Sequence, residues 1–387
     1  MPLSSRQPAR RIPIVCVDRH GSEAKATING IAPDVLVWLS CARPLVTASH
    51  SNRLDDQGGE PLNLSFSVAM CTFNGARFLA AQLASIAAQD RPPDELVVCD
   101  DGSSDGCIEI VREFARRAPF STRLVVNDGN LGSTKNFEKA ISLCQGAIVV
   151  LADQDDVWYR HKLGRIERAF LRSNEIILAF SDADMINDDS KPLGVRLWST
   201  FSFNHAEQIQ FANGHALNVL VKHPVVTGAT MAFRRECFDL LAPIPARQHH
   251  DRWISFLLAA RGKFETISGP LMQYRQHHGQ QVGPGPWTLR ERTLRARLTT
   301  ANFYLNEVER FHEFQDRLQE CRATFPSAEL ALTEIARKIS HLEHRARLPR
   351  ARVARIPRVL RQTLNGDYWR YSTGWNSIAK DLVVRYV

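Results

Sequence analysis

The sequence lacks long hydrophobic segments. It has no run of about 18 or more apolar residues, the length that identifies a membrane-spanning helix. The nearest candidate, IAPDVLVWLSCA at 31–42, is shorter than this and contains Pro33 and Asp34. The basic N-terminal segment RQPARRIPIVCVDRHG returns to charged residues without a long apolar region, so we expect no secretory signal peptide. These absences predict a cytoplasmic protein without a transmembrane helix.

Cysteine motifs are missing as well. The eight cysteines include no CxxC pair and none of the tight, even spacing that a disulfide scaffold or a zinc site uses. Cys71, Cys99 and Cys144 lie in apolar segments, where a free cysteine behaves as a small hydrophobic residue. We therefore expect a protein of a reducing, cytosolic compartment.

The overall composition is that of a folded protein. Hydrophobic residues make up 44% and charged residues 23% of the 387 residues, which excludes globally disordered and fibrous classes. The 49 Lys and Arg outnumber the 41 Asp and Glu, and the net charge of +8 favours an anionic partner. Much of the excess lies in RARLPRARVARIPRVLR at 345–361, which contains no acidic residue.

This basic segment allows two interpretations. Four apolar residues lie on roughly one helical face: Val353, Ile356, Leu360 and Leu364. They predict either a basic amphipathic element on an anionic membrane or one face of a helical subdomain packed on the core. Pro349 and Pro357 are expected to interrupt any single long helix. Nucleic acid is not expected as a partner, because no recognised binding motif accompanies the charge.

Alternating strands and helices begin at Leu64. Residues 1–62 show no sustained periodicity, and we expect a poorly ordered N-terminal extension. Five nearly all-apolar segments are typical of buried strands: LSFSVAMC, ELVVCD, RLVVN, AIVVLAD and IILAFSD. Amphipathic helical segments separate them, which predicts an α/β domain at 63–285 with a mostly parallel sheet and helices on both faces. Residues 286–387 are expected to form a helical, basic region.

Acidic clusters follow three of the predicted strands. In a parallel sheet, ligands bind beyond the carboxyl ends of the strands, and CDDGSSD, DQDD and SDAD occupy such positions. Asp105 favours helix capping, whereas Asp101 favours a ligand contact, because adjacent buried carboxylates need donors or a cation. In DQDD, Asp156 alone could form a capping turn. Asp153 and Asp155 are spaced so that both can face one hard cation.

Eight motifs in order resemble a known family. They are SVAMCTFNGARFLAAQLASIAAQ, ELVVCDDGSSD, NLGSTKNF, VVLADQDDVW, FSDADMI, VTGATMAF, HHDRW and YRQHHGQQVG. Between about 64 and 283 the sequence resembles a family 2 glycosyltransferase with the GT-A fold. It is most similar to the subset of rhamnosyltransferase-like enzymes of bacterial O-antigen and exopolysaccharide assembly.

The resemblance implies a nucleotide-sugar donor and gives roles to particular residues. Four are expected near the nucleoside: Thr72, Asn74, Gly75 and Asp101. Asp153 and Asp155 correspond to the DxD carboxylates that hold Mg2+ or Mn2+ on the diphosphate, and Asp153 is also expected to contact the donor. Asp251 stands at the position of the catalytic base. Three residues are expected on the acceptor side: Thr227, Gly228 and Trp253.

Several of these residues have a second interpretation. Asp251 opens the segment DRWISFLLAARG and could be a helix N-cap. Arg275 is expected at the diphosphate, or else as a surface arginine after a strand. His277 is expected either to complete the metal shell or to face solvent. Gly228 marks either a close approach of the acceptor or a glycine bulge in a buried strand.

The sequence therefore predicts an inverting, metal-dependent glycosyltransferase. A divalent ion would neutralise the leaving nucleoside diphosphate, while a carboxylate on the opposite face deprotonates the acceptor hydroxyl. The expected donor is dTDP-L-rhamnose or a UDP-hexose, and the expected acceptor is a saccharide or a lipid-linked saccharide at the inner face of a bacterial plasma membrane. The alternatives are a metal-dependent nucleotidyltransferase and a catalytically dead saccharide-binding relative.

Overall fold

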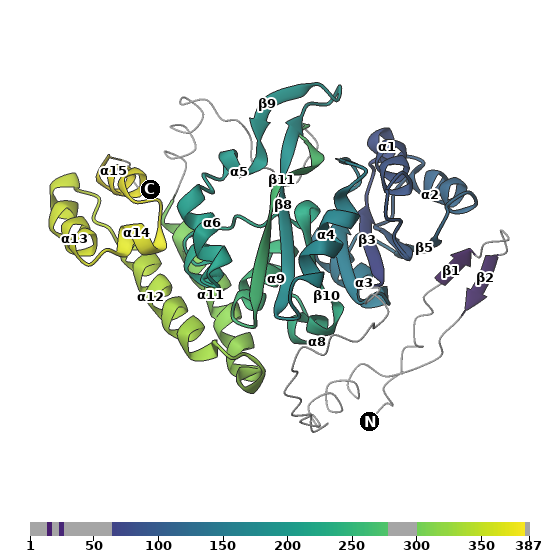
Figure 1. The fold of residues 1–387 in the computed structure, drawn as a ribbon. Coiled ribbons are helices and arrows are strands. Elements are labelled where there is room, and N and C mark those ends of the chain that lie inside the picture. The colour runs from purple at the N-terminus through teal and green to yellow at the C-terminus, as the bar shows by residue number, and fades with distance from the viewer. Residues whose placement is uncertain (1–13, 18–22, 27–63, 278–299, 384–387) are drawn as a thin grey trace, which may run out of the picture.

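The computed structural model describes residues 14–17, 23–26, 64–277 and 300–383. Within these ranges one sheet of 11 strands runs through the molecule in the order β2-β1-β5-β4-β3-β6-β10-β8-β11-β7, and β9 pairs with β8 (Figure 1). None of the described helices combines the length and the apolar character needed to span a bilayer.

Four neighbouring strands of the sheet are parallel, as predicted. In spatial order they are β5 (Ser121–Val126), β4 (Glu95–Asp100), β3 (Phe66–Thr72) and β6 (Ile148–Ala152). In β3, Val68 and Met70 join one buried cluster and Ala69 joins the other, because successive strand residues point to opposite faces. The strands are therefore buried on both sides.

The second half of the sheet is mixed, so the expectation of a mostly parallel sheet was wrong there. The short strand β10 (Met231–Arg234) lies between β6 and β8 (Ile176–Ile186) and runs antiparallel to both. β8 pairs in parallel with β11 (Lys263–Arg275), whereas β7 (Val157–Trp158) and β9 (Pro192–Arg196) pair antiparallel at the margins. Strand direction depends on the route of the connecting chain, which the composition of an apolar segment does not encode.

Helices cover both faces of the sheet, as predicted. One face carries α1 (Ala76–Ala87), α2 (Cys107–Ala115) and α4 (Lys162–Leu171). The other face carries α3 (Ser133–Leu143), α6 (His205–Ala212), α7 (Ala216–Leu220), α8 (Phe238–Leu241) and α9 (His250–Ala259). Three shorter elements lie at connections: α5 (Leu197–Thr200), η1 (Gly228–Thr230) and η2 (Arg235–Cys237). The predicted α/β class is confirmed.

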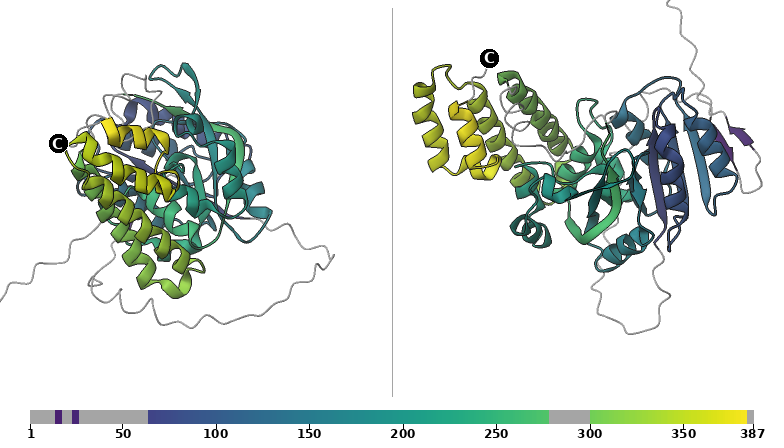
Figure 2. Two further views of the ribbon diagram at one scale, coloured as in Figure 1. Left: turned by 90° about the vertical axis from the view of Figure 1, so that its left-hand side faces the viewer. Right: turned by 90° about the horizontal axis from the view of Figure 1, so that it is seen from above.

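The C-terminal region is helical and packs on the sheet domain. It contains α11 (Ala301–Glu320), η3 (Arg322–Thr324), α12 (Ala328–Ala346), α13 (Arg352–Leu364), α14 (Asp367–Tyr371) and α15 (Trp375–Val383). Phe314 of α11 stacks on Trp253 of α9 with ring centroids 5.0 Å apart, which joins the two regions in one core. Figures 1 and 2 place α13, α14 and α15 at the end of the molecule away from β1 and β2.

One proline expectation was wrong. Pro349 does separate α12 from α13, but Pro357 lies inside α13. Pro357 lies in the second turn of α13, where it removes one backbone hydrogen bond without ending the helix.

Two short strands fall within the predicted N-terminal extension. β1 (Ile14–Val17) pairs antiparallel with β2 (Glu23–Ala26) and with β5. The remainder of 1–62 lies outside the described residues, so its expected poor order stays a prediction.

We expect the substitution Asp381→Ala to destabilise the C-terminal region strongly. The buried carboxylate of Asp381 accepts two bonds from Arg345, both 2.8 Å, and a 2.7 Å bond from the Tyr368 hydroxyl. Removing it leaves a buried guanidinium uncompensated, and the free energy of unfolding should fall by about 3–5 kcal/mol in urea titrations. The control Tyr368→Phe deletes one bond and should cost about 1 kcal/mol. Equal losses in the two variants would contradict this account.

Candidate active site

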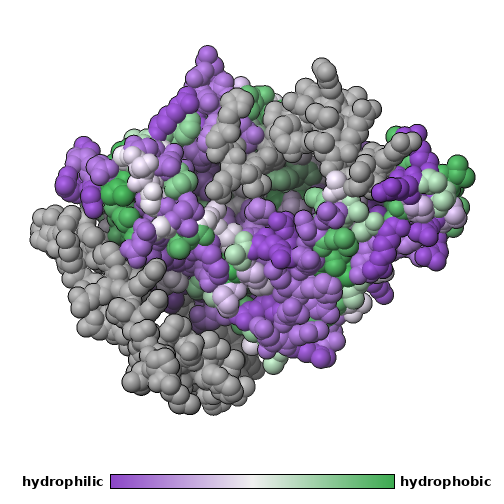
Figure 3. Space-filling model, turned by 180° about the vertical axis from the view of Figure 1, so that it is seen from behind, coloured by the Kyte–Doolittle hydropathy of each residue, from purple (hydrophilic) through white to green (hydrophobic). Residues whose placement is uncertain are grey.

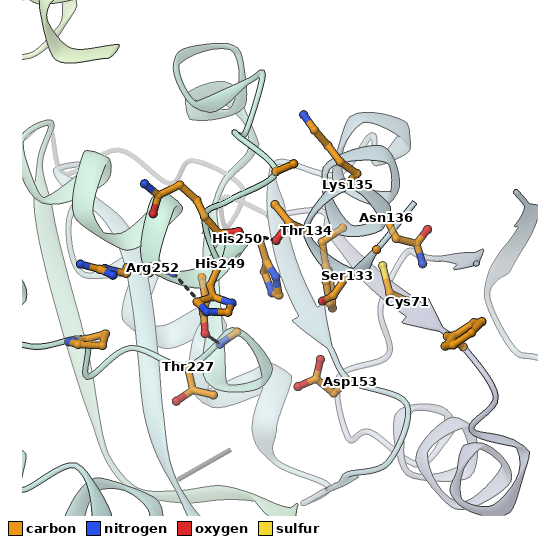
Figure 4. A pocket seen from close by; sticks show the side chains of 18 of the residues that line it. Cys71, Ser133, Thr134, Lys135, Asn136, Asp153, Thr227, His249, His250 and Arg252 are labelled. Atoms are coloured by element: carbon orange, nitrogen blue, oxygen red, sulfur yellow. Dashed lines mark hydrogen bonds between the residues drawn. The ribbon is translucent and has the colours of Figure 1, made fainter. Parts of the chain in front are cut away.

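A cavity of about 1120 Å³ lies beyond the carboxyl ends of β3, β4 and β6. Its walls come from the strand ends, from the loop before α3, from the turn after β6, from residues 227–228 and 246–252, and from α11. Figure 4 shows Asp153, Thr227 and His250 among the side chains that surround it. Eight of the predicted site residues line this cavity: Thr72, Asp101, Asp153, Asp155, Thr227, Gly228, Asp251 and His277.

The Gln154 side chain lies close against the backbone of the turn after β3. Asn74 has a positive φ of 46°, and its side-chain oxygen accepts a 2.9 Å bond from the Ser104 amide. A Cβ at Gly75 would lie 2.1 Å from the Gln154 side chain, so a larger residue here would displace the Gln154 amide. Gln154 in turn bonds both backbone groups of Phe73, at 2.9 and 3.1 Å. Asn74 and Gly75 therefore shape the turn from behind the cavity lining, and their nucleoside contact stays a prediction.

Asp101 organises the loop that leads into α3. Its carboxylate accepts bonds from the Asn127 side chain at 2.9 Å and from the amides of Leu131 and Gly132 at 2.8 and 2.9 Å. The preceding Asp100 is engaged within its own turn and accepts a 2.6 Å bond from Thr72. Donors therefore compensate both adjacent carboxylates, as the sequence argument required for buried charge.

Asp153 carries excess negative charge into the cavity. Burial, and then the nearby carboxylates of Asp155 and Asp251, raise the pKa of Asp153 to about 7. The backbone carbonyl of Asp153 accepts a 3.0 Å bond from Gln82 of α1, which fixes the turn after β6. Asp153 and Asp251 line the same cavity, one after β6 and the other in α9.

Asp155 pairs with His277. The His277 Nε2 atom lies 2.7 Å from an Asp155 carboxylate oxygen, and the imidazole ring lies 5.1 Å from the ring of Phe78. Both residues line the cavity. The sequence left open whether His277 faces solvent, and the structure instead places it beside a predicted metal ligand.

Asp156 and Lys162 lie beneath this turn. Asp156 accepts a 2.9 Å bond from the Arg275 amide, and burial followed by the charge of Asp155 raises its pKa. Burial lowers the pKa of Lys162 to about 7, and its amine donates a 2.7 Å bond to the Ala229 carbonyl. Since α4 begins at Lys162, Asp156 does not cap that helix.

Arg275 is buried, and it is absent from the described cavity lining. Its guanidinium donates to the Asp155 carbonyl at 2.7 Å and to the Asn187 and Asp188 carbonyls at 3.0 and 3.2 Å. These bonds tie the turn after β6 to the connection between β8 and β9. The predicted diphosphate contact of Arg275 stays a prediction, whereas its surface location is excluded.

Asp251 lies in the first turn of α9. The helix begins at His250 with His249 at the N-cap, so Asp251 is not the cap. One Asp251 carboxylate oxygen accepts a 3.3 Å bond from the Gly228 amide, and the other accepts a 2.7 Å bond from the Arg252 amide. The carboxylate is thus oriented at the cavity wall by two backbone donors.

Gly228 does not lie in a strand, and Trp253 does not line the cavity. Gly228 lies in the short helix η1 rather than in a strand, and a Cβ there would lie 2.7 Å from the His250 Nε2 atom. Trp253 is buried against Phe314 and donates to the Leu241 carbonyl at 2.8 Å. Trp253 is not part of the described cavity lining, so its acceptor-side role stays a prediction.

The C-terminal helices supply a wall that the sequence analysis missed. Phe303, Glu307 and Arg310 of α11 line the cavity. Glu307 accepts bonds of 3.1 and 2.8 Å from both terminal nitrogens of Arg252, the neighbour of Asp251. The periodicity of the segment 301–320 puts Glu307 and Arg310 on one helical face, but nothing in it indicates that this face reaches the site.

The chemistry of the site fits a divalent cation. No cluster of three or more His, Cys, Asp or Glu side chains in metal-binding geometry occurs among the described residues. The two carboxylates of Asp153 and Asp155 nevertheless line one cavity, and burial, followed by the charge of Asp155, raises the pKa of Asp153. Carboxylate oxygens are the ligands that Mg2+ and Mn2+ prefer, and a cation would relieve this repulsion.

Comparison with known proteins identifies the family. Residues 67–241 match the family described as glycosyl transferase family 2. These residues form a family 2 glycosyltransferase domain, which confirms the predicted family, the predicted GT-A fold class and the glycosyltransferase activity. The rhamnosyltransferase-like subset stays a prediction.

Three similar proteins illustrate the relationship. An uncharacterised glycosyltransferase of Nostoc sp. is 26% identical over 63% of this chain and 75% of its own length. A UDP-Glc:α-D-GlcNAc-diphosphoundecaprenol β-1,3-glucosyltransferase of Escherichia coli is 27% identical over 32% of this chain and 47% of its own length. The crystal structure of S. aureus TarS 1–349 covers 82% of this chain and 88% of its own, with 16% identity and a TM-score of 0.48.

We expect Gly228→Ala to disturb the cavity wall. The new methyl group would overlap the buried His250 ring, which is stacked on Phe137 at 4.0 Å and cannot retreat. The free energy of unfolding should fall by about 1–3 kcal/mol, measured by urea titration. Gly129→Ala is the matched control, because a Cβ at Gly129 meets nothing within 4 Å. A stable Gly228→Ala variant would show that His250 can move.

Proposed function

We propose that this protein is an inverting, metal-dependent glycosyltransferase that extends a saccharide or lipid-linked saccharide acceptor in cell-surface polysaccharide synthesis. One observation supports this most directly. Asp153, Asp155 and Asp251 line a single cavity, and the charge of Asp251 contributes to the raised pKa of Asp153. The proposed metal ligands and the proposed catalytic base therefore share one cavity.

The donor side is the turn after β6. Asp153 and Asp155 would hold Mg2+ or Mn2+, and His277 is close enough to Asp155 to contribute to the same site. When bound, the cation neutralises the charge that develops on the departing nucleoside diphosphate. Thr72 and Asp101 line the adjacent wall, where we place the nucleoside. Gln82 and Arg275 hold the backbone of the metal-binding turn in position.

Asp251 is the proposed catalytic base. The Gly228 amide and the Arg252 amide orient its carboxylate at the cavity. An acceptor hydroxyl that approaches past Thr227 and Gly228 would give its proton to Asp251 as the new glycosidic bond forms. Attack from the face opposite the leaving group inverts the anomeric configuration in a single displacement.

The identity of the substrates rests on similarity. The name of the E. coli relative gives a UDP-glucose donor and a diphosphoundecaprenol-linked acceptor for that protein. This supports a UDP-hexose donor and a lipid-linked acceptor here, and dTDP-L-rhamnose remains the donor of the rhamnosyltransferase-like subset. We also propose that the protein works on the cytoplasmic side of the plasma membrane, in peripheral contact with anionic lipid through its basic C-terminal region.

The alternative enzyme class has less support. A metal-dependent nucleotidyltransferase would need a glycine-rich basic loop for a triphosphate near its first strand, and the turn after β3 offers only Gly75 and Arg77. The Gln154 side chain packs against Gly75 and fills the space that a phosphate would need there. A catalytically dead relative would have no need to keep Asp101, Asp153, Asp155 and Asp251 together.

Removal of divalent metal should abolish turnover. With a panel of UDP-hexoses and dTDP-L-rhamnose, we expect nucleoside diphosphate release to stop on EDTA treatment and to return on addition of Mn2+ or Mg2+. Asp155→Ala should lower kcat/KM by about 10²–10³-fold, because developing charge is no longer neutralised. Asp189→Asn, a change at an exposed carboxylate, is the control. Turnover that survives both EDTA and Asp155→Ala would exclude a metal at this position.

The substitution Asp251→Asn should separate binding from chemistry. The amide keeps the size of the carboxylate but cannot accept the acceptor's proton, so kcat should fall by about 10²–10⁴-fold. Donor affinity, measured by calorimetry with the nucleoside diphosphate and Mn2+, should remain unchanged. If kcat is also unchanged, Asp251 is not the base. Release of pyrophosphate from a nucleoside triphosphate would instead favour the nucleotidyltransferase.

A further inference from the structure

Helix α13 presents a hydrophobic stripe to the outside of the molecule. Its buried face consists of Arg355, Val359 and Gln362. On the opposite face lie four large aliphatic side chains with exposed fractions of 52–78%: Val353, Ile356, Leu360 and Leu364. With about 3.6 residues per turn, these four positions fall within one narrow stripe along the helix. Contiguous exposed apolar surface of this kind marks an interaction site.

Arginines border this stripe on both sides. At about 100° per residue, Arg358 and Arg361 lie on one side of the stripe and Arg352 lies on the other. All three are exposed, and no acidic residue occurs in α13. A cavity of about 660 Å³ between α12 and α13 is lined by Arg347, Arg358, Arg361, His344, Glu343, Ser340 and Pro357. The surroundings of the stripe therefore attract anions.

Two exposed tryptophans lie on the neighbouring helices. Trp369 of α14 and Trp375 of α15 have exposed fractions of 42% and 70%, and their ring centroids are 5.4 Å apart. Tryptophan combines an apolar ring with a polar N–H group and is favoured at the boundary between lipid and water. In Figure 3, hydrophobic and strongly hydrophilic residues alternate at the end of the molecule that α13–α15 form.

The stripe is held in a fixed orientation. The buried Arg355 guanidinium donates to the Pro349 carbonyl at 2.6 Å and to the Asp381 carbonyl at 2.8 Å. Asp381 in turn accepts the two bonds from Arg345 of α12. These contacts fasten α13 to α12 and α15, so that the apolar stripe is exposed without any rearrangement.

We propose that the outer face of α13, together with the exposed Trp369 and Trp375 of α14 and α15, is the docking surface for an anionic lipid bilayer. A helix with an apolar stripe and exposed arginines on both sides of it matches the acyl boundary and the phosphate headgroups of such a bilayer. Charge complementarity favours this occupant over a second copy of the chain, since the arginines of two copies would repel each other. The inference gives the proposed membrane contact a defined surface, and its test measures binding rather than catalysis.

The test is co-sedimentation of the full-length protein with vesicles. Wild type should bind vesicles of phosphatidylglycerol and phosphatidylethanolamine, and should bind pure phosphatidylcholine vesicles at least about tenfold more weakly. The double substitution Leu360→Asn and Leu364→Asn should weaken binding by about tenfold or more, because two apolar side chains no longer enter the acyl boundary. Arg358→Gln with Arg361→Gln should produce a similar loss that disappears at high salt.

Matched controls come from other exposed positions. Leu171→Asn with Leu330→Asn changes leucines with exposed fractions of 49% and 52% that lie outside the stripe, and should leave vesicle binding intact. Arg116→Gln with Arg117→Gln, at exposed positions directly after α2, is the charge control. Thermal unfolding should be unchanged in all four double variants, because every altered side chain is exposed.

Several outcomes would overturn the proposal. It fails if wild type ignores phosphatidylglycerol vesicles, or if the stripe variants and the controls lose binding equally. If the stripe variants instead abolish a concentration-dependent dimer seen by light scattering, with no vesicle binding by wild type, the surface is a protein interface. Sugar transfer to a soluble acceptor should persist in the stripe variants, so loss of docking and loss of the proposed catalysis are distinguishable.

Discussion

Repulsion among the carboxylates that follow β6 is the constraint on which the site depends. Asp153, Asp155 and Asp156 lie within four residues, and burial together with their mutual charge raises the pKa values of Asp153 and Asp156. Such a turn could not hold its shape through its own bonds alone. It is fixed from outside by Gln82 of α1 and by Arg275 of β11, which bond its backbone carbonyls. The carboxylates of Asp153 and Asp155 line the cavity, where a cation would relieve their repulsion.

The opposite side of the cavity depends on the C-terminal region. Asp251 lies in α9, and the neighbouring Arg252 is clamped by Glu307 of α11. Trp253 fastens the same helix to Phe314. The C-terminal helices therefore do more than cover the sheet domain: they complete the cavity wall and contact the two residues that follow the proposed base.

The sequence predicted the parts of the site that follow from strand order. Residues directly after buried parallel strands must meet at one edge of the sheet, and Asp101, Asp153 and Asp155 do so. Arg275 was harder to interpret, because a guanidinium suits a diphosphate and backbone carbonyls equally well. Its carbonyl partners at Asn187 and Asp188 are 88 and 87 residues away, and no local pattern indicates that they are close.

The geometry of an α-helix explains why Asp251 lines the cavity and Trp253 does not. Asp251 and Trp253 were both expected at the cavity, but two residues along an α-helix differ by about 200° in direction. Because the segment 250–259 is a helix, the two side chains point to opposite sides. Trp253, the large apolar one, is buried in the core. The reversed strand β10 and the wall formed by α11 offered no such local signal, since both depend on how distant segments return to the sheet.

The same helical region that closes the cavity also bears the outward stripe of α13. In α11 the charged residues Glu307 and Arg310 face the site, whereas Phe311 and Phe314 join the core. α12 continues this core, and its Arg345 reaches through Asp381 to the helices that carry the stripe. A path of packed helices thus links the Asp251 side of the cavity to the outer surface. For a lipid-linked acceptor this arrangement has a physical advantage, because docking through α13 would hold the cavity at a fixed height and orientation relative to the bilayer in which the acceptor is anchored.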